Sequence, residues 1–416
     1  MTEVQDLQAQ TREWLTANWD PNASLVAWRT KLAESGWATA HWPKDFYGLG
    51  LSPAESAAIT DVFHELGIIG AASSGVRMLA AATILEHGSP DQKRRFLPRI
   101  ITGEDSWCQL FSEPGSGSDL AGATTRADRN GDAWVVNGQK VWNTSAHHAE
   151  WGLLVARTDW DVPKHQGLSY FIIDMHQPGM EVRQLRQMNG HASFNEVFMT
   201  DALVPRDNLV GNTGDGWQVA VTTLAHERRG ADRQRDGGSI ARLEGPIYDE
   251  YRRELEIANE PYKWYPQRAG RVDLVIERAQ ETGAIDDPVI RQDIARLLVL
   301  ARTTQWTAAR ARAAQQAGKP QGPEGSLGKL SASNIARLAA RVHTDITGIE
   351  AMLTGPDSPR EGTIAEILVS VPAVSIAGGT DEIQKNIISE RVLGMPKEPR
   401  FDTGPFKDVP RNLSDI

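Results

Sequence analysis

The sequence predicts an α+β protein whose helices and strands lie in separate blocks. Apolar residues at helical spacing give way near Trp107 to β-branched and aromatic runs, and helical spacing returns after Gly216. This order differs from the strand–helix alternation of a Rossmann domain. We expect four parts: an N-terminal helical domain at residues 1–106, a central β domain at 107–211, a C-terminal helical bundle at 212–396, and a tail at 397–416 whose weak periodicity predicts a path over the surface.

The N-terminal block shows the spacing of amphipathic helices. Leu7 and Thr11 belong to a row of residues at helical intervals. The segment 66–85 is rich in alanine, the residue with the highest helix propensity. Pro90 opens a further stretch, in which we expect a short helix leading to Pro98.

The central block carries strand and turn signals. Asn137-Gly138 lies between two apolar runs and is the strongest short signal for a hairpin turn. The runs at 152–159 and 168–175 are typical of strands, and the last strand-like run ends at Pro205.

Helical spacing resumes in the C-terminal block. Ala220, Leu224 and Glu227 share one helical face. Residues 230–270 are unusually polar and contain prolines, which indicates either a broken helix or an insertion. Two long helices are expected after it, at 290–316 and 327–353.

Composition limits the classes of function. The chain is 40% hydrophobic and 24% charged with a formal net charge of −10, which is unfavourable for binding nucleic acid. The one cysteine, Cys108, excludes an internal disulfide framework and a cysteine-built metal site, and beside Trp107 it is typical of a strand or core residue. Neither a signal peptide nor a run of about 18 apolar residues is visible. We therefore expect a cytoplasmic protein without a metal site.

Two glycine-containing stretches could approach an anionic ligand. Gly378-Gly379 precedes Thr380, which is suited to cap a helix whose apolar face carries Ile383. A helix N-terminus behind a glycine pair is a natural anion site. The stretch at 115–119, G-S-G-S-D, lacks both the dinucleotide-binding G-x-G-x-x-G pattern and the lysine of a P-loop.

Four motifs resemble those of the acyl-CoA dehydrogenase family. They are L-F-S-E-P-G-S-G-S-D at 110–119, N-G-Q-K-V-W-N-T at 137–144, D-A-L-V-P-R-D-N-L-V-G-N-T-G-D-G-W at 201–217, and G-G-T-D-E-I-Q-K-N-I-I-S-E-R-V-L-G at 378–394. They span most of the chain in the order of the family, and the stretch D-D-P-V-I-R-Q is similar to divergent actinobacterial-type members. The resemblance implies a helical N-terminal domain, a β-barrel-like central domain and a C-terminal four-helix bundle, with bound FAD.

The resemblance also implies an activity and partners. The expected reaction is α,β-dehydrogenation of an acyl-CoA thioester in fatty acid or lipid degradation. A carboxylate removes the α proton, flavin N5 accepts the β hydride, and hydrogen bonds stabilise the thioester oxygen. Electrons then pass to an electron-transfer flavoprotein or a similar acceptor, and the chain is expected to form a homodimer, homotetramer or heterotetramer.

Four positions in these motifs match family residues that contact the flavin. Trp142 matches the tryptophan beside the ring, and Thr144, two residues on and thus on the same strand face, matches a hydroxyl donor near N5. Leu110 and Ser112 match positions that bond to the flavin through backbone or hydroxyl groups, although the family often has threonine at the position of Ser112. Without the motifs, Trp142 would be interpreted as a core residue and Thr144 as an exposed strand residue.

Three further positions match ligand-binding residues of the family. Ser118 matches a residue at the entrance for the CoA pantetheine and pyrophosphate, and Thr380 and Glu382 match positions near the dinucleotide. The alternatives are a plain turn at 115–118 and ordinary helix capping at Thr380.

The carboxylate that many family members place before the motif threonine is absent. The position two residues before Thr380 is Gly378, which offers only its backbone N–H to the thioester oxygen. Some members carry the base on an earlier helix, within a Leu-x-x-Glu-Arg segment, and T-L-A-H-E-R-R at 223–229 places Glu227 there. We therefore expect Glu227 to be the base. The alternative is an ion pair of this carboxylate with Arg228, Arg229 or Arg233.

A second departure concerns contacts between subunits. Relatives often carry an Arg-x-x-Phe-Gly segment that reaches the FAD of a neighbouring subunit, and the stretch 285–294 contains none. Two alternatives to a dehydrogenase therefore stay open. One is a flavoprotein of the same fold with other CoA-thioester chemistry, and the other is a non-catalytic partner subunit of a heteromeric dehydrogenase.

Overall fold

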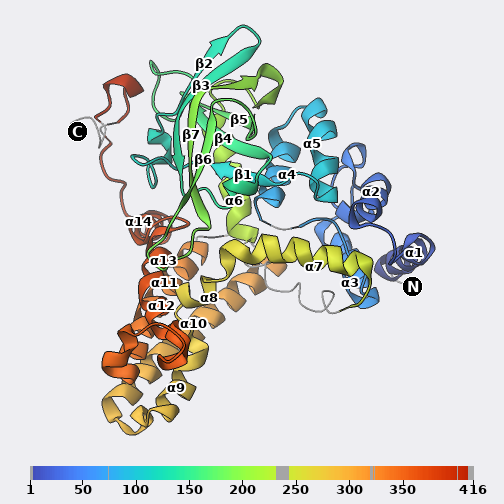
Figure 1. Cartoon of the computed structure of the whole chain (residues 1–416). Helices are drawn as coiled ribbons and strands as arrows, with labels where there is room; N and C mark the ends of the chain where they lie inside the picture. The colour runs from blue at the N-terminus through green and yellow to red at the C-terminus, as the bar shows by residue number, and fades with distance from the viewer. Residues whose placement is uncertain are drawn as a thin grey trace. The chain divides into compact units, whose positions relative to one another are not determined.

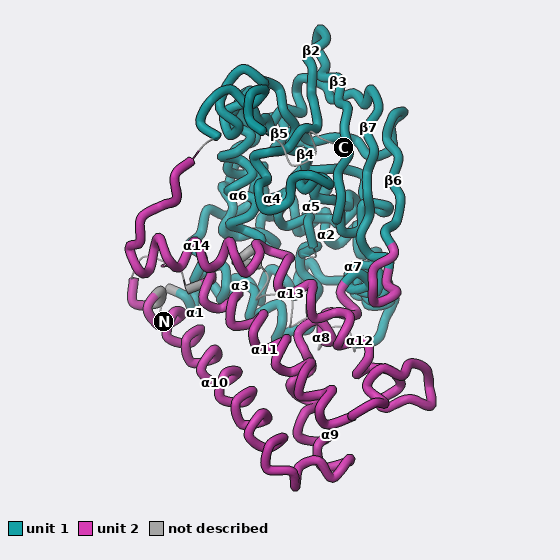
Figure 2. The backbone as a smooth tube through the Cα atoms, turned by 90° about the vertical axis from the view of Figure 1, so that its left-hand side faces the viewer, with its two compact units in different colours: residues 1–185, 192–261, 401–416 teal, residues 186–191, 262–400 magenta. Residues whose placement is uncertain are grey.

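The computed structural model of the chain describes residues 3–73, 75–230, 243–318, 322, 324–400 and 402–410 (Figure 1). The chain forms two compact units (Figure 2). Unit 1 contains residues 1–185, 192–261 and 401–416, and unit 2 contains residues 186–191 and 262–400.

Helices make up the N-terminal part of unit 1, as the periodicity predicts. Two of them begin with a capping box. The hydroxyls of Ser52 and Ser89 each accept a hydrogen bond from a backbone N–H three residues on, and the backbone N–H of each serine donates to the side chain of that same residue, Glu55 or Gln92. Their core includes Trp28, Leu32 and Ile59. The helices are α1 (Glu3–Asn18), α2 (Leu25–Ser35), α3 (Pro53–Leu66), α4 (Val76–His87) and α5 (Pro90–Thr102).

Helix α5 continues past Pro98, where the sequence predicted its end. Proline has no N–H to donate to the carbonyl of Arg94, one turn earlier. The Tyr47 hydroxyl donates to that carbonyl instead, over 3.2 Å. This substitute donor offsets part of the cost of a proline inside the helix and lets α5 reach Thr102.

The strands of unit 1 form one sheet in the order β6-β7-β3-β2-β4-β5-β8, with β1 added beside β4. One face carries Leu154, Phe171 and Val197 into a buried core. Cys108 lies in this core, as expected, and burial raises the pKa of its thiol. The strands are β1 (Trp107–Leu110), β2 (Arg126–Asn130), β3 (Ala133–Val141), β4 (Trp151–Arg157), β5 (Leu168–Asp174), β6 (Met180–Leu185), β7 (Phe194–Pro205) and β8 (Leu209–Val210).

The predicted hairpin turn at Asn137-Gly138 is wrong. These residues lie inside β3, where the register against β7 shifts between Val136 and Gly138. The Asn137 amide and the backbone N–H and carboxylate of Asp201 bond to each other at 2.9 and 3.0 Å across the bulge. The hairpin turn joins β2 to β3 at 131–132 instead. The extra residue of the bulge lies in β7, where Thr200 and Asp201 face Asn137 and Asp201 has a left-handed φ of +51°.

Two helices follow the sheet within unit 1. Helix α6 (Gly216–Gly230) contacts α4 and β5, and α7 (Pro246–Asn259) packs on the N-terminal helices through Ile247 and Tyr248. Glu254 of α7 pairs with buried Arg29 at 2.7 Å and with Arg77 at 3.1 Å. The described part of the polar segment is helical over Pro246–Asn259, and residues 231–242 lie outside the described residues.

The C-terminal tail differs from the expectation. Residues 402–410 dock on the β domain of unit 1, where Phe406 is 1% exposed and Pro405 forms a bridge with Pro163. The sequence analysis overlooked this because a single anchoring aromatic residue gives no periodicity.

Unit 2 is helical. Helix α11 contacts α9, α10 and α12 to α14, around a core that includes Leu297, Val342 and Ile364. The helices are α8 (Tyr265–Arg268), α9 (Val275–Glu281), α10 (Pro288–Gln316), α11 (Glu324–Thr347), α12 (Thr363–Ser370), α13 (Pro372–Ile376) and α14 (Asp381–Arg391).

The segment Pro359–Arg391 is apolar enough by composition to resemble a membrane span, with a mean hydropathy of 1.5 in its most apolar window. It consists of α12, α13 and α14, which are 8, 5 and 11 residues long. Each is shorter than the roughly 20 residues that cross a bilayer as a helix.

We expect the close approach of Thr125 to make the stability of the protein sensitive to substitution at Gly138. A Cβ at this position would lie 2.5 Å from Thr125 Oγ1 and 2.7 Å from Thr125 Cα. Gly138→Ala should lower the free energy of unfolding by about 2–3 kcal/mol. Gly131→Ala is the control, because its Cβ would meet no atom within 4 Å and only its positive φ opposes it. Urea denaturation of both variants measures the difference, and equal losses would contradict the prediction.

Candidate active site

The predicted flavin-facing segment leaves β1 at Leu110 and is held by β3. The backbone N–H of Val141 donates to the carbonyl of Ser112 over 2.9 Å, and Lys140 Nζ donates to the carbonyl of Phe111 over 2.9 Å. Leu110 is buried and Ser112 is half-buried. The structure thus brings Leu110 and Ser112 next to the end of β3, from which Trp142 follows.

A buried ion pair underlies this arrangement. Lys140 Nζ lies 2.8 Å from Glu113 Oε1, and both side chains are buried. Glu113 also accepts hydrogen bonds from the N–H and hydroxyl of Thr124 and from the N–H of Thr125, at 2.7–2.9 Å. Burial alone would raise the pKa of Glu113, but Lys140 and these donors outweigh it and lower the pKa to about 2.

The roles of Lys140 and Glu113 were not predicted from the sequence, although both residues lie within the family-like motifs. The available signal was the alternation along β3, where Val136 and Lys140 occupy inward positions four residues apart. A lysine on the inner side of a strand requires a buried partner.

Trp142 lies on the surface, not in the core. Its side chain is 60% exposed, and its ring packs edge-on against Phe194 with centroids 5.9 Å apart. Its φ of +65° belongs to the left-handed region, which a bulky residue rarely adopts. An exposed aromatic ring held by a strained backbone is suited to form one wall of a site for a planar ligand.

The sequence predicted that Thr144 and Trp142 share a strand face. This prediction is wrong. Strand β3 ends at Val141, and both residues lie in the turn that follows it. The left-handed backbone at Trp142 breaks the alternation that the prediction assumed. Buried Asn143 fixes the turn, since its side chain donates to the carbonyl of Gln109 over 2.8 Å and its backbone pairs with Asn195. Thr144 is half-buried beside this anchor.

Ser118 lies in an exposed loop between β1 and β2. Glu113 and Ser116 exchange backbone hydrogen bonds across the turn, at 2.9 and 3.0 Å. The Ser116 hydroxyl donates to the carbonyl of Asp119. The turn that the alternative reading predicted is therefore present, and it leaves Ser118 exposed at its tip.

Helix α6 places Glu227 one turn beyond Thr223. The Thr223 hydroxyl is fully buried and lies 2.8 Å from Thr83 Oγ1 and 3.0 Å from the Tyr170 hydroxyl. Residues four apart share a helical face, so Glu227 follows this buried row and is itself half-buried. His226 lies to one side of it, 3.6 Å from Glu86. The predicted pairing with Arg228, Arg229 or Arg233 concerns side chains outside the described residues.

The glycine pair in unit 2 has an unusual backbone. Gly378 and Gly379 have φ of +68° and +86°, and Gln384 Nε2 donates to both of their carbonyls at 3.3–3.4 Å. Among the described residues, the Gly378 N–H has no acceptor. Thr380 caps α14, as predicted, by accepting from the N–H of Ile383 over 3.3 Å.

The acids of the first turn of α14 differ in their surroundings. Glu382 is exposed, with Lys385 at 4.0 Å. Asp381 is buried and pairs with Arg337 at 3.0 Å. Burial favours the neutral form of Asp381, but Ser333 and Arg337 outweigh this and lower its pKa.

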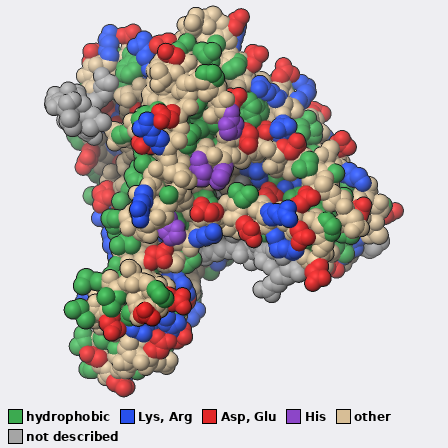
Figure 3. All heavy atoms as spheres, viewed as in Figure 1, with side chains coloured by type: hydrophobic (Ala, Val, Ile, Leu, Met, Phe, Trp, Pro, Cys, Tyr) green, Lys and Arg blue, Asp and Glu red, His purple; other side chains and the backbone are tan. Residues whose placement is uncertain are grey.

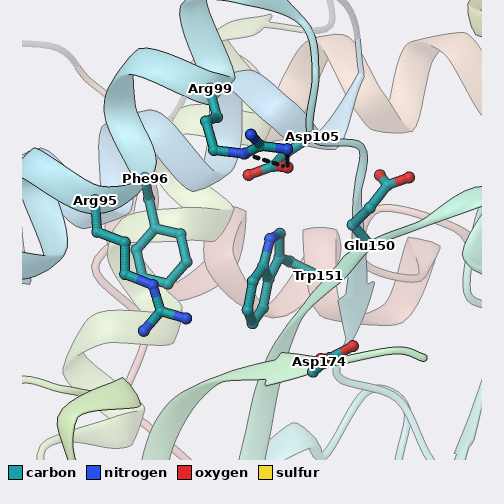
Figure 4. A pocket seen from close by; sticks show the side chains of 7 residues that line it. All are labelled: Arg95, Phe96, Arg99, Asp105, Glu150, Trp151 and Asp174. Carbon is teal, nitrogen blue, oxygen red and sulfur yellow. Dashed lines mark hydrogen bonds and ion pairs between the residues drawn. The ribbon is translucent and has the colours of Figure 1, made fainter. Parts of the chain in front are cut away.

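A surface cavity of about 350 Å³ in unit 1 does not contain the predicted site residues (Figure 4). It lies at the start of β4, where Trp151 pairs with Trp107, whereas Leu110 pairs three residues further along with Leu154. Its charged groups have partners: Arg99 bonds to Asp105 at 2.8 Å, and Glu150 accepts from Ser106 at 2.5 Å. Its lining comprises Arg95, Phe96, Arg99, Asp105, Glu150, Trp151 and Asp174.

Charge on the visible face is mixed. Figure 3 shows basic and acidic side chains interspersed over this face. This distribution, with the net charge of −10, does not favour a nucleic-acid ligand.

Three family models match the chain. The acyl-CoA dehydrogenase N-terminal domain matches residues 2–104, the middle domain matches 108–202, and the C-terminal domain matches 269–393.

Curated proteins and solved structures give the same result. The chain is 34% identical to acyl-CoA dehydrogenase IpdE1 of Mycobacterium tuberculosis, over 96% of this chain and 100% of that protein. It is 36% identical to acyl-CoA dehydrogenase FadE34 of the same organism, over 88% of this chain and 46% of that protein. The ChsE4-ChsE5 complex from Mycobacterium tuberculosis matches with 26% identity and a TM-score of 0.64, over 96% of this chain and 99% of that chain. The Tcur3481-Tcur3483 steroid ACAD shares the fold, with 22% identity and a TM-score of 0.65, over 96% of this chain and 99% of that chain.

The buried pair of Lys140 and Glu113 should make the free energy of unfolding depend on pH. Because the pKa of Glu113 is lowered from 4.5 to about 2, its contribution is complete above about pH 4.5 and is lost as the pH falls toward 2. Glu113→Gln leaves Lys140 buried without its counter-ion and should cost about 3–5 kcal/mol at neutral pH. The double variant Glu113→Gln/Lys140→Met should cost less.

Chemical denaturation between about pH 6 and pH 3 measures both effects. The gap between wild type and Glu113→Gln should narrow as the pH falls, and a gap that stays constant would show that the ionised carboxylate contributes nothing. Glu181→Gln is the control, because Glu181 pairs with Arg183 on the surface, where a pair contributes at most about 1 kcal/mol.

Proposed function

The chain belongs to the acyl-CoA dehydrogenase family, whose members are FAD-dependent oxidoreductases that act on CH–CH donors, and we propose that Glu227 is its catalytic base. In this proposal, Glu227 removes the α proton of an acyl-CoA thioester and the backbone N–H of Gly378 donates to the thioester oxygen. The substrate leaves as the α,β-unsaturated thioester.

The position of Glu227 on α6 is the observation that carries this assignment. The buried contacts of Thr223 with Thr83 and Tyr170 fix the rotation of α6 about its axis. They direct the face that carries Glu227 toward the interior rather than toward solvent. Glu227 is half-buried on this face, and a partly desolvated carboxylate is suited to act as a base.

The backbone at Gly378 is a second, independent observation in support of this assignment. A residue with a Cβ would have to adopt a φ of +68°, which costs an L-residue roughly 1–2 kcal/mol. The chain therefore favours glycine where many relatives carry their glutamate. The N–H that remains is a donor of the kind that stabilises a developing enolate oxygen.

The residues present fit a flavin. Trp142 would form a wall beside the ring, and Thr144, Leu110 and Ser112 would provide hydroxyl and backbone groups along its polar edge. Thr380 and Glu382, at the start of α14, would lie near the rest of the dinucleotide, and Ser118 near the CoA chain. FAD, when bound, would supply the hydride acceptor of the reaction.

Partners follow from the same premise. We propose that electrons leave through an electron-transfer flavoprotein or a similar acceptor, and that the chain forms a homodimer, homotetramer or heterotetramer. Helix α10 supports an assembly, because Val289, Val299 and Trp306 are all more than 60% exposed on it. Exposed large apolar side chains are found at protein interfaces, where a partner covers them.

Glu227→Gln tests the base. Glutamine keeps the shape of the side chain but cannot take a proton, so the rate of flavin bleaching by a CoA thioester should fall about 10²- to 10⁴-fold. The bound FAD, measured by its visible absorbance, should not change. His226→Gln is the control, because His226 precedes Glu227 on the same helix and its ring lies 3.6 Å from Glu86.

Two results would contradict the proposal. Bleaching that survives in Glu227→Gln would remove Glu227 as the base. A wild-type chain that stays colourless with added FAD would support the partner-subunit alternative instead.

A further inference from the structure

We propose that the C-terminal segment 402–410 is a clamp that positions the loop 115–119 through Lys164. The proposal rests on the proposed function, because it assigns this loop, with Ser118, to the entrance for CoA. All the groups concerned belong to unit 1. The clamp would make Lys164 and Asp402 positioning residues for substrate binding.

An aromatic anchor seats the segment. The ring of Phe406 lies 5.5 Å from the ring of Trp160, centroid to centroid, and the guanidinium carbon of Arg157 lies 3.4 Å from its centroid. Arg157 is fully buried. A desolvated cation over an aromatic face is a stronger contact than an exposed one, so Phe406 covers a charge that would otherwise meet water.

Arg157 is tied to the loop as well as to the anchor. Its guanidinium donates to the carbonyls of Ala121 and Ala123 at 2.6 and 3.0 Å, and to the carbonyl of Lys164 at 3.0 Å. Ala121 and Ala123 follow the loop 115–119 directly. One buried side chain therefore connects the docked segment with the end of the loop and with the β4–β5 connection.

Backbone contacts fix the register of the segment. The N–H of Phe406 donates to the carbonyl of Val162 over 2.9 Å, and the N–H of Lys407 donates to the carbonyl of Trp160 over 3.0 Å. A bridge between Pro163 and Pro405 lies alongside. The segment is thus held at defined residues rather than resting on a smooth surface.

Lys164 joins the segment to the loop. Its ammonium lies 2.5 Å from Asp402 and at 2.8 and 2.9 Å from the two carboxylate oxygens of Asp119. Its side chain is only 10% exposed and that of Asp402 is 23% exposed, so this pair is screened less than a surface pair, whereas the Asp119 side chain is 61% exposed. Asp119 is the last residue of the loop and accepts the Ser116 hydroxyl at its carbonyl, so holding Asp119 restricts the residues on either side of Ser118.

The geometry indicates positioning rather than simple covering. Phe406 and its contacts fix where the segment lies, and Asp402 then shares one cation with Asp119. Without the segment, Lys164 would gain water and Asp119 would lose part of its restraint. The loop would sample more conformations, and binding of CoA would have to order it at an entropic cost.

The test compares the full chain with a chain ending at Arg400 and with the single variants Asp402→Asn and Phe406→Ala, all with FAD added. Hydrogen exchange followed by mass spectrometry should show faster exchange in peptides covering 113–123 in all three. The KM for a CoA thioester should rise about tenfold with kcat within about twofold, as expected for a lost contribution to uniform binding. Lys407→Gln is the control, because Lys407 pairs with exposed Asp161 and contacts neither carboxylate of the clamp.

Unchanged exchange at 113–123 in the variants would overturn the clamp, whatever the kinetics show. Faster exchange with an unchanged KM would overturn its role in substrate binding. The single variants keep the test valid if the shortened chain unfolds. Failure of the proposed function is a separate result: the full chain would then show no reduction by any CoA thioester, while the exchange difference would remain.

Discussion

The ion pair between Lys140 and Glu113 is the constraint on which the β domain depends. Burying two charges costs several kcal/mol per ion, and such a pair is stable only when its remaining hydrogen-bonding capacity is used. Here the carboxylate accepts from Thr124 and Thr125, and the ammonium donates to the carbonyl of Phe111. Since these partners come from the residues just after β1, the residues just before β2 and the end of β3, one pair fixes three chain segments.

A second buried contact does the same for the helices. The Thr223 hydroxyl lies 2.8 Å from the Thr83 hydroxyl and 3.0 Å from the Tyr170 hydroxyl, and so joins α6 to α4 and β5. A helix held by polar contacts has one permitted rotation, whereas apolar packing alone tolerates small turns about the axis. The direction of Glu227 therefore depends on three hydroxyl groups that take no part in the proposed chemistry.

The sequence was sufficient for the fold and for most local elements. Periodicity and ordered motifs predicted helices, then strands, then helices, and Thr380 as a cap. The predictions that failed concern individual residues rather than whole elements. Asn137-Gly138 stayed inside β3 because Asp201 bonds to Asn137 from another strand, and Trp142 turned out of the strand face because its backbone is left-handed. The α5 helix passed Pro98 because a distant tyrosine hydroxyl replaced the missing donor. The first and the last of these failures depend on a partner far away in the sequence, which no pattern of neighbours records.

The left-handed backbone at Gly378 also sets what a side chain at this position would require. Two glycines in succession with positive φ form a bend that other residues enter only with strain. A glutamate at position 378 would bear this strain, roughly 1–2 kcal/mol, as Glu361 does at a φ of +55° in the same chain. The bend therefore disfavours a carboxylate at position 378 by an energy comparable to that of one hydrogen bond, and it does not forbid one.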